Sequence, residues 1–427
     1  MKSANERPSA SFTAPAGNST RRWLRVFIGI CVAQFILLLA LSQIWKVHTP
    51  LALRRLPVYS PTNRVPHFVG QPGPWGELEY VRISLEPPDE FVPLDQGEMP
   101  PTRWFFADFT PAQLTELFET SDLAPGQRTE LLKPVLWHAE TNGIVVTPPV
   151  NLLRELSPAA RSHIYSVLAR SPQNDFQCWP FTYRDGGLAD WFDHSGLSAT
   201  TMAALKQMTY PRGPALCFSD LGALFAQVTD PVERQRVVKT LSRHSTVVLK
   251  LRIRPDSDPR SLTAYWGRGR RAKDVGPFLE SLTHVPGGIT VDVAHLLPPF
   301  ARKRLNSFPD PAASGDSLPD CYWTAFNFFN DPPDNRYYDE TVWRQELEKE
   351  FTQVTDPKLG DLVFLVRPDG VPLHCAAYVA DDVVFTKNGA NPRQPWLLMK
   401  LADMLARYPE DFPLRVTYFR TNRSGRE

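Results

Sequence analysis

The clearest hydrophobic pattern in the C-terminal part of the chain predicts a helix. Ala325, Phe328 and Phe329 stand at i, i+3 and i+4, which is the spacing of a buried amphipathic helix. Asp320 stands where an N-cap residue would, so Cys321 is expected to begin the first turn. Unpaired N–H groups and the helix dipole at that position favour a thiolate. Cys321 is therefore a candidate nucleophile, although a cysteine in a core helix is more often a small packing residue.

Downstream of this helix, the apolar runs predict an antiparallel sheet. The runs 362–366 and 373–379 flank a Pro-Asp-Gly turn, so they are expected to pair as a β-hairpin. A third strand is predicted over 382–389, a further helix over 396–408 and a last strand over 414–419. Helices followed by an antiparallel sheet indicate the α+β class.

His374 opens the second strand of the predicted hairpin and is the candidate general base. A base must contact the thiol, and a third polar group must orient its ring. Asn388, at the end of the next predicted strand, is the expected orienting residue. Cys375 follows His374 directly, so its side chain is expected to point to the other face of the strand, into packing.

Three short motifs together resemble the NlpC/P60 superfamily of papain-like peptidases and its CHAP relatives. They are Asp320-Cys321 at a helix start, Gly360-Asp361-Leu362-Val363-Phe364, and His374-x-x-x-Tyr378. The order of Cys321 before His374 matches the unpermuted members. Tyr322 stands where NlpC/P60 members usually carry serine. The third polar position of NlpC/P60 falls near Thr386, whereas Asn388 is the more CHAP-like choice.

The resemblance implies a papain-like domain over residues 245–427, with Cys321, His374 and Asn388 as its catalytic residues. Its expected activity is that of a cysteine amidase or peptidase, a hydrolase that acts on a peptide or peptidoglycan-like substrate in the cell wall. A non-catalytic binding or scaffold protein is the alternative. In that reading the papain-like fold would dock a ligand through a basic strand face in residues 246–254.

The N-terminus has the pattern of a membrane anchor. Residues 1–22 are polar and are predicted to form a disordered cytoplasmic tail. Residues 23–45 are mostly apolar between Trp23 and Trp45, and as a single transmembrane helix they would cross roughly 30 Å of hydrocarbon. The preceding arginines predict a cytoplasmic N-terminus and an extracytoplasmic bulk, periplasmic or in the cell envelope. A signal peptide cleaved after Ser42 is the alternative, and it gives the same compartment.

Between the predicted anchor and the papain-like domain, two regions are expected. Residues 46–101 are rich in proline and are predicted to form an extended tether. Residues 102–244 are predicted to form a mainly helical middle domain. Thr110, Ser157 and Asp230 each precede a proline, in the arrangement of a helix N-terminus.

Composition limits the partners that are expected. The chain has 47 basic and 46 acidic residues and a net charge of +1, so nucleic acid is not an expected partner. The histidines of the middle region have no metal-ligand spacing, and no metal or cofactor is expected. Cys178 and Cys217 could form a disulfide outside the cytoplasm or remain free thiols. The sequence does not specify an oligomeric state.

The predicted topology can be tested by protease accessibility. A protease added outside spheroplasts is expected to digest the C-terminal domain, because the arginines before Val26 retain only the N-terminal tail in the cytoplasm. Immunoblotting against the C-terminus measures the digestion, with a cytoplasmic protein as the control for lysis. Protection of the C-terminal domain in intact spheroplasts would contradict the topology.

Overall fold

The computed structural model describes residues 67–94, 97, 99–310 and 318–423. Among these residues, no helix is long and apolar enough to cross a membrane. The predicted tail at 1–22 and the predicted anchor at 23–45 lie outside the described residues, as does most of the first half of the predicted tether. The described chain is a mixed α+β protein with several antiparallel sheets.

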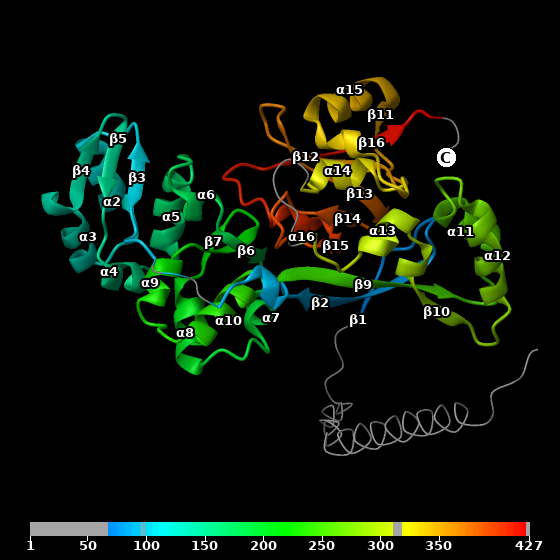
Figure 1. Cartoon of the computed structure of the whole chain (residues 1–427), viewed down its shortest axis with the longest axis horizontal. Helices are drawn as coiled ribbons and strands as arrows, with labels where there is room; N and C mark the ends of the chain where they lie inside the picture. Colours follow the sequence, from blue (N-terminus) through cyan, green and yellow to red (C-terminus); the bar gives the residue numbers. More distant parts are fainter. Residues whose placement is uncertain (1–66, 95–96, 98, 311–317, 424–427) are drawn as a thin grey trace, which may run out of the picture. The chain divides into compact units, whose positions relative to one another are not determined.

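The C-terminal part is built on a six-stranded antiparallel sheet (Figure 1). Its order is β11-β16-β12-β13-β14-β15. The strands are β11 (Phe351–Val354), β12 (Leu362–Val366), β13 (Pro372–Ala380), β14 (Val383–Lys387), β15 (Trp396–Lys400) and β16 (Arg415–Thr421). Strands β12 and β13 pair as the predicted hairpin, with Leu365 opposite His374 and Phe364 opposite Cys375.

One predicted helix is a strand for half of its length. The segment predicted as a helix over 396–408 is β15 followed by the short helix α16 (Leu401–Leu405). Residues Trp396 to Met399 are all buried, so both faces of this segment pack against apolar side chains. A short run that is apolar on every side has no period, and it fits a strand buried on both faces as well as a helix.

Helices cover both faces of the six-stranded sheet. On one face, α14 (Cys321–Phe326) packs on β13 and β14, and α15 (Glu340–Glu350) joins the same hydrophobic core through Trp343. The opposite face packs on α16 through Met404, in a smaller cluster that also holds Ala376. The 3₁₀ helix η5 (Asn335–Tyr338) connects α14 to α15.

The start of β12 is fixed by the Gly360-Asp361 pair. Gly360 has φ +84°, and an added Cβ would lie 2.0 Å from the Phe329 ring, so only glycine fits there. The buried Asp361 carboxylate accepts hydrogen bonds from the Lys358 backbone N–H at 2.7 Å and from the Arg420 guanidinium at 2.6 Å. In this way Asp361 joins β12 to β16.

A second sheet has the order β1-β2-β9-β10 and is also antiparallel. Its strands are β1 (His67–Val69), β2 (Glu77–Leu85), β9 (His244–Ile253) and β10 (Ile289–Asp292). Figure 1 shows β9 lying along β2 for its whole length. Strands β1 and β2 belong to the segment predicted as a tether, so that part of the chain is folded. The hydroxyl of Thr246 on β9 donates to the carbonyl of Leu398 on β15 at 2.8 Å, which connects the two sheets.

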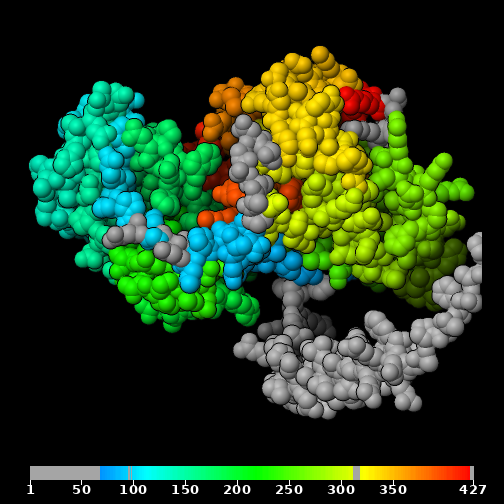
Figure 2. Space-filling view, in the orientation of Figure 1, coloured from blue at the N-terminus to red at the C-terminus, as the bar shows by residue number. Residues whose placement is uncertain are grey.

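Helices that follow β9 fill the space beside the second sheet. They are α11 (Pro259–Trp266), α12 (Ala272–Thr283), the 3₁₀ helix η3 (Val293–Leu296) and α13 (Pro299–Arg304). Figure 2 shows these residues in yellow-green, beside the yellow residues that include α14 and α15. Trp266 and Phe300 are fully buried in the hydrophobic core that also contains the face of β13 under α14.

The middle region is less purely helical than predicted. It contains the sheets β3-β5-β4 and β6-β8-β7. Their strands are β3 (Trp104–Ala107), β4 (Trp137–Glu140), β5 (Gly143–Val146), β6 (Phe181–Arg184), β7 (Tyr210–Arg212) and β8 (Ala215–Phe218). The helices are η1 (Asp89–Phe91), α2 (Pro111–Thr120), α3 (Pro125–Leu131), η2 (Pro134–Leu136), α4 (Val150–Glu155), α5 (Pro158–Leu168), α6 (Asp175–Cys178), α7 (Leu188–Phe192), α8 (Ala199–Met208), α9 (Leu221–Phe225) and α10 (Pro231–Leu241).

The predicted helix starts of the middle region are confirmed. Thr110 forms a capping box with Gln113, Ser157 accepts from the Ala160 N–H, and Asp230 accepts from the second and third N–H groups of its helix. The chain enters this region at Leu85 and leaves it at His244, and these two residues are opposite each other in the β2–β9 pairing.

A buried ion pair holds the middle region together. The Arg161 guanidinium donates to the Asp220 carboxylate at 2.8 Å, and both side chains are fully buried. The Tyr165 hydroxyl donates to the other carboxylate oxygen at 2.6 Å. Arg161 also donates to the carbonyls of Leu153 and Leu156, so the charge of each partner is compensated by hydrogen bonds.

Removing one partner of this pair is expected to destabilise the protein strongly. Asp220→Ala leaves the Arg161 charge buried without its carboxylate, so the free energy of unfolding should fall by about 3–5 kcal/mol. The matched control is Glu140→Ala, which breaks the exposed pair with Arg103 and should cost less than about 1 kcal/mol. Urea unfolding measures both. Equal losses for the two variants would contradict the structural role of Asp220.

Candidate functional site

The predicted nucleophile stands at a helix start, as expected. Helix α14 begins at Cys321, and the Asp320 carboxylate accepts from the backbone N–H of Trp323 at 2.7 Å. The helix is only six residues long. Its opposite side is held by Trp396, whose indole N–H donates to the Thr324 hydroxyl at 3.0 Å. Position and capping therefore follow the sequence prediction.

The electrostatics at Cys321 differ from the prediction. The residue is only 5% exposed, and burial, followed by the charge of Asp320, raises the pKa of its thiol to about 12. Backbone N–H groups of Cys375, Cys321 and Tyr322 act in the opposite direction, because they hydrogen-bond to the thiolate form. Desolvation is the larger effect, so the Cys321 thiol is neutral at pH 7 instead of being activated by the helix dipole.

His374 is buried in β13, and each of its ring nitrogens is hydrogen-bonded to a hydroxyl group. Its Nε2 lies 2.8 Å from the Thr386 hydroxyl and its Nδ1 lies 2.6 Å from the Tyr408 hydroxyl. The Tyr408 ring also packs against the imidazole, with 4.8 Å between ring centroids. Burial lowers the pKa of His374 to about 3, so the ring is neutral at pH 7.

Thr386 hydrogen-bonds to the His374 ring, and Asn388, the residue predicted to orient it, does not. Thr386 belongs to β14 and stands on the same sheet face as His374. Asn388 lies beyond the end of β14, and its amide nitrogen approaches the Met399 sulfur at 3.4 Å. Its buried Oδ1 has no partner among the described residues. Thr386 is also the position to which the NlpC/P60 resemblance pointed.

Strand β13 separates the two predicted catalytic side chains. Cys375 is fully buried in the hydrophobic core beneath α14, as expected, and its backbone N–H acts on the Cys321 thiol. The next side chain, His374, points to the other face, where Tyr408 lies. Within residues 318–423, the partners of the imidazole are hydroxyls, and the predicted hydrogen bond between Cys321 and His374 is not formed.

Tyr408 packs against the imidazole on this second face. Burial raises the pKa of its hydroxyl, and the charge of a Cys321 thiolate would raise it further. Tyr408 was not predicted as a site residue, because it stands beyond α16 and carries no motif. It is recognisable only after the chain has folded.

Lys387 is a second residue that the sequence did not single out. Its ammonium donates to the carbonyls of Gly389 at 2.6 Å and Asn391 at 3.1 Å. Burial lowers its pKa to about 8, while the neighbouring Cys321 and Asp320 favour the charged form. A buried cation beside a thiol can stabilise negative charge on sulfur.

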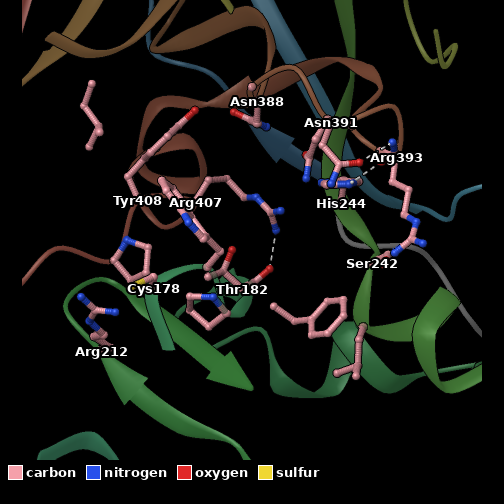
Figure 3. Close-up of a pocket in the computed structure, with 18 of the residues that line it drawn as sticks. Cys178, Thr182, Arg212, Ser242, His244, Asn388, Asn391, Arg393, Arg407 and Tyr408 are labelled. Carbon is pink, nitrogen blue, oxygen red and sulfur yellow. Dashed lines mark hydrogen bonds between the residues drawn. The ribbon is translucent and has the colours of Figure 1, made fainter. Parts of the chain in front are cut away.

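A cavity of about 510 Å³ adjoins Tyr408. Figure 3 shows Tyr408, Asn388 and Arg407 on one side of it, with Thr182 and Arg212 on the other. The cavity therefore has walls from both the six-stranded-sheet part and the middle region. Cys178 also lines it. Cys178 and Cys217 are both free thiols, and the disulfide considered from the sequence is not formed.

Comparison with protein-family models, with curated proteins and with solved structures found no match to this chain.

The buried imidazole of His374 is expected to make the free energy of unfolding depend on pH in the acid range. In the unfolded chain a histidine binds a proton near pH 6.5, whereas His374 in the folded protein binds one only near pH 3. Its contribution is therefore fully present above about pH 6.5 and is lost as the pH falls below it. From pH 6 to pH 5 the free energy of unfolding should fall by about 1 kcal/mol more in the wild type than in His374→Gln.

Urea unfolding at the two pH values measures this difference. His138→Gln, at an exposed histidine, is the matched control and should keep the wild-type pH dependence. If His374→Gln also keeps the wild-type dependence between pH 6 and pH 5, the imidazole is not held neutral by burial.

Proposed function

We propose that residues 245–427 form a papain-like cysteine hydrolase, an amidase or peptidase, in which Cys321 is the nucleophile and His374 the general base. Thr386 takes the orienting role first assigned to Asn388. The observation that carries this proposal is that the Cys321 thiol and the His374 imidazole lie at adjacent positions along β13, the thiol at the Cys375 N–H on one face and the buried imidazole, held at Nε2 by Thr386, on the other. That hydrogen bond leaves Nδ1 as the nitrogen available to a thiol proton.

The described conformation corresponds to a resting state. The thiol and the imidazole are both neutral, and the Tyr408 hydroxyl occupies Nδ1. Once Tyr408 leaves and the thiol and imidazole, which β13 separates here, are brought together, Nδ1 can accept the thiol proton as sulfur attacks the carbonyl carbon of an amide. The imidazolium then returns the proton to the leaving amine, and water hydrolyses the thioester by the same base. The backbone N–H groups near Cys321 can stabilise the oxyanion.

The substrate and the compartment follow from the sequence patterns alone. The predicted N-terminal anchor would hold the enzyme at the membrane with its bulk outside the cytoplasm. In that compartment the amide bonds of cell-wall peptides are the substrate that the NlpC/P60 resemblance favours. The protein is therefore proposed to act on peptide or peptidoglycan-like material at the cell envelope.

A non-catalytic binding protein is the second candidate, and the burial of Cys321 favours it. A thiol with a pKa near 12 and an imidazole bonded to two hydroxyls could be structural. The basic face first considered for docking is less suitable. Lys250 and Arg252 stand opposite Glu79 and Glu77 on β2, so neighbouring carboxylates compensate their charge.

The hydrolase proposal is tested by product release from wall-derived peptides. Cys321→Ser and His374→Ala should each abolish turnover, and the double variant should lose no more, because the two residues act as one unit. Thr386→Ala should lower kcat by roughly 10²-fold, because the base loses its orientation. Asn388→Ala is the matched control and should retain activity. Turnover that persists without Cys321 would contradict the thiol mechanism, and wild-type binding without turnover would favour the binding protein.

The resting state has its own test with the same proteins. Tyr408→Phe removes the hydroxyl from Nδ1 of His374 and should speed the alkylation of Cys321 by iodoacetamide at neutral pH. Tyr418→Phe, at a half-buried tyrosine of β16, is the control. Peptide mass mapping identifies the labelled cysteine. If Cys375 reacts before Cys321, or if Tyr408→Phe leaves the rate unchanged, Tyr408 does not restrain the thiol.

A further inference from the structure

The cavity beside Tyr408 has the size and the lining of a small-molecule site. Its volume of about 510 Å³ falls within the usual range for ligand pockets. Its walls come from Cys178 to Thr182 and Leu241 to His244 on one side, and from residues 388–394 and 407–410 on the other. Several buried polar atoms of the residues that line it have no partner within the described part of the chain, and their types indicate what would bind.

Arg407 brings a positive charge to the cavity. Its guanidinium donates to the carbonyl of Thr182 across the cavity, and its Nε is buried without a partner among the described residues (Figure 3). Burial lowers the pKa of Arg407 to about 10, so it stays charged at pH 7. No carboxylate of the described residues pairs with it. A buried cation without a counter-charge is costly, and an anion would compensate it.

The carboxylates near the cavity do not compensate the charge of Arg407. Glu410 pairs with Arg367 at 3.0 Å, and Asp411 pairs with Arg212 at 3.4 Å. Arg393 donates from Nε to the carbonyl of Phe91, which carries no charge. The carboxylates close to the cavity are therefore matched by other arginines, and Arg407 and Arg393 add positive charge.

Residues that line the cavity also carry buried hydrogen-bond acceptors without a partner among the described residues. His244 is 1% exposed, and its Nε2 donates to the carbonyl of Arg393 at 3.3 Å, so its Nδ1 carries a lone pair. That Nδ1 has no partner among the described residues, and the buried side-chain oxygens of Asn388 and Gln394 likewise have none there. A ligand that meets all of these atoms must supply several hydrogen-bond donors, whereas the hydrogen phosphate dianion carries a single O–H.

We propose that this cavity binds a small organic acid whose carboxylate meets Arg407 and whose neighbouring N–H groups meet His244 and Asn388. An N-acylated dipeptide or the carboxyl end of a short peptide has this chemistry, because two amide N–H groups accompany its carboxylate. A guanidinium recognises a carboxylate through two parallel hydrogen bonds, and Arg407 still has its Nε free for one of them. The inference concerns binding alone and stands whether or not Cys321 is catalytic.

Calorimetric titration of the purified full-length chain tests the inference. The probes are N-acetylalanylalanine, its C-terminal amide N-acetylalanylalaninamide, and orthophosphate. N-acetylalanylalanine should bind, and the amide should bind at least roughly 10-fold more weakly, since a charge-assisted hydrogen bond is lost. The titration is repeated with Cys321→Ala, which should bind the acid like the wild type. Failure of the hydrolase proposal therefore leaves this result unaffected.

Variants locate the site. Arg407→Gln should weaken binding of the acid at least roughly 10-fold, and Arg407→Lys, which keeps the charge, should weaken it less. Arg103→Gln removes an exposed arginine just before β3 and is the matched control. The acid–amide comparison on the wild type needs no variant, so a misfolded Arg407→Gln does not remove the test. Equal binding of acid and amide, tighter binding of orthophosphate, or no binding of the acid at millimolar concentration would each overturn the inference.

Discussion

The alternation of side chains along β13 is the constraint on which the candidate site depends. Successive residues of a strand point to opposite faces, so His374 and Cys375 cannot both face α14. Cys375 packs in the core beneath α14. On the other face, the hydroxyls of Thr386 and Tyr408 hydrogen-bond to the His374 ring. The Cys321 sulfur approaches the backbone of β13, where the Cys375 N–H hydrogen-bonds to the thiolate form. A shift of one residue in the pairing with β12 would exchange the two faces and remove this arrangement.

Burial dominates the electrostatics around this strand. Cys321 and His374 both remain neutral because charging either group would place it in a medium that solvates it poorly. The helix dipole and the N–H groups at Cys321 oppose this effect but do not exceed it. A site of this kind needs a rearrangement that admits water or substrate before a thiolate can form. Tyr408 is the group whose movement would free Nδ1 of His374.

Local signals in the sequence predicted the parts of the site that depend on local structure. The Asp320 cap, the β12–β13 hairpin and the inward position of Cys375 follow from residues close to one another in the chain. Thr386 was passed over for Asn388, because the choice depends on where β14 ends, which no local signal fixes. Tyr408 comes into contact with His374 only because α16, which precedes it, packs on the sheet. Strand β15 was mistaken for a helix, since its apolar run has no period.

The pairing of Leu85 with His244 has a consequence for how this chain could have been assembled. The residues between them, with their own core and the buried Arg161–Asp220 pair, leave and rejoin the fold at two facing positions of one antiparallel ladder. Paired strands normally need only a tight turn at such a place. The middle region thus has the topology of a domain inserted into a β-hairpin, and its gain or loss would leave the ladder and the thiol intact. The cavity, which borrows Thr182, Arg212 and His244, exists only in the composite protein.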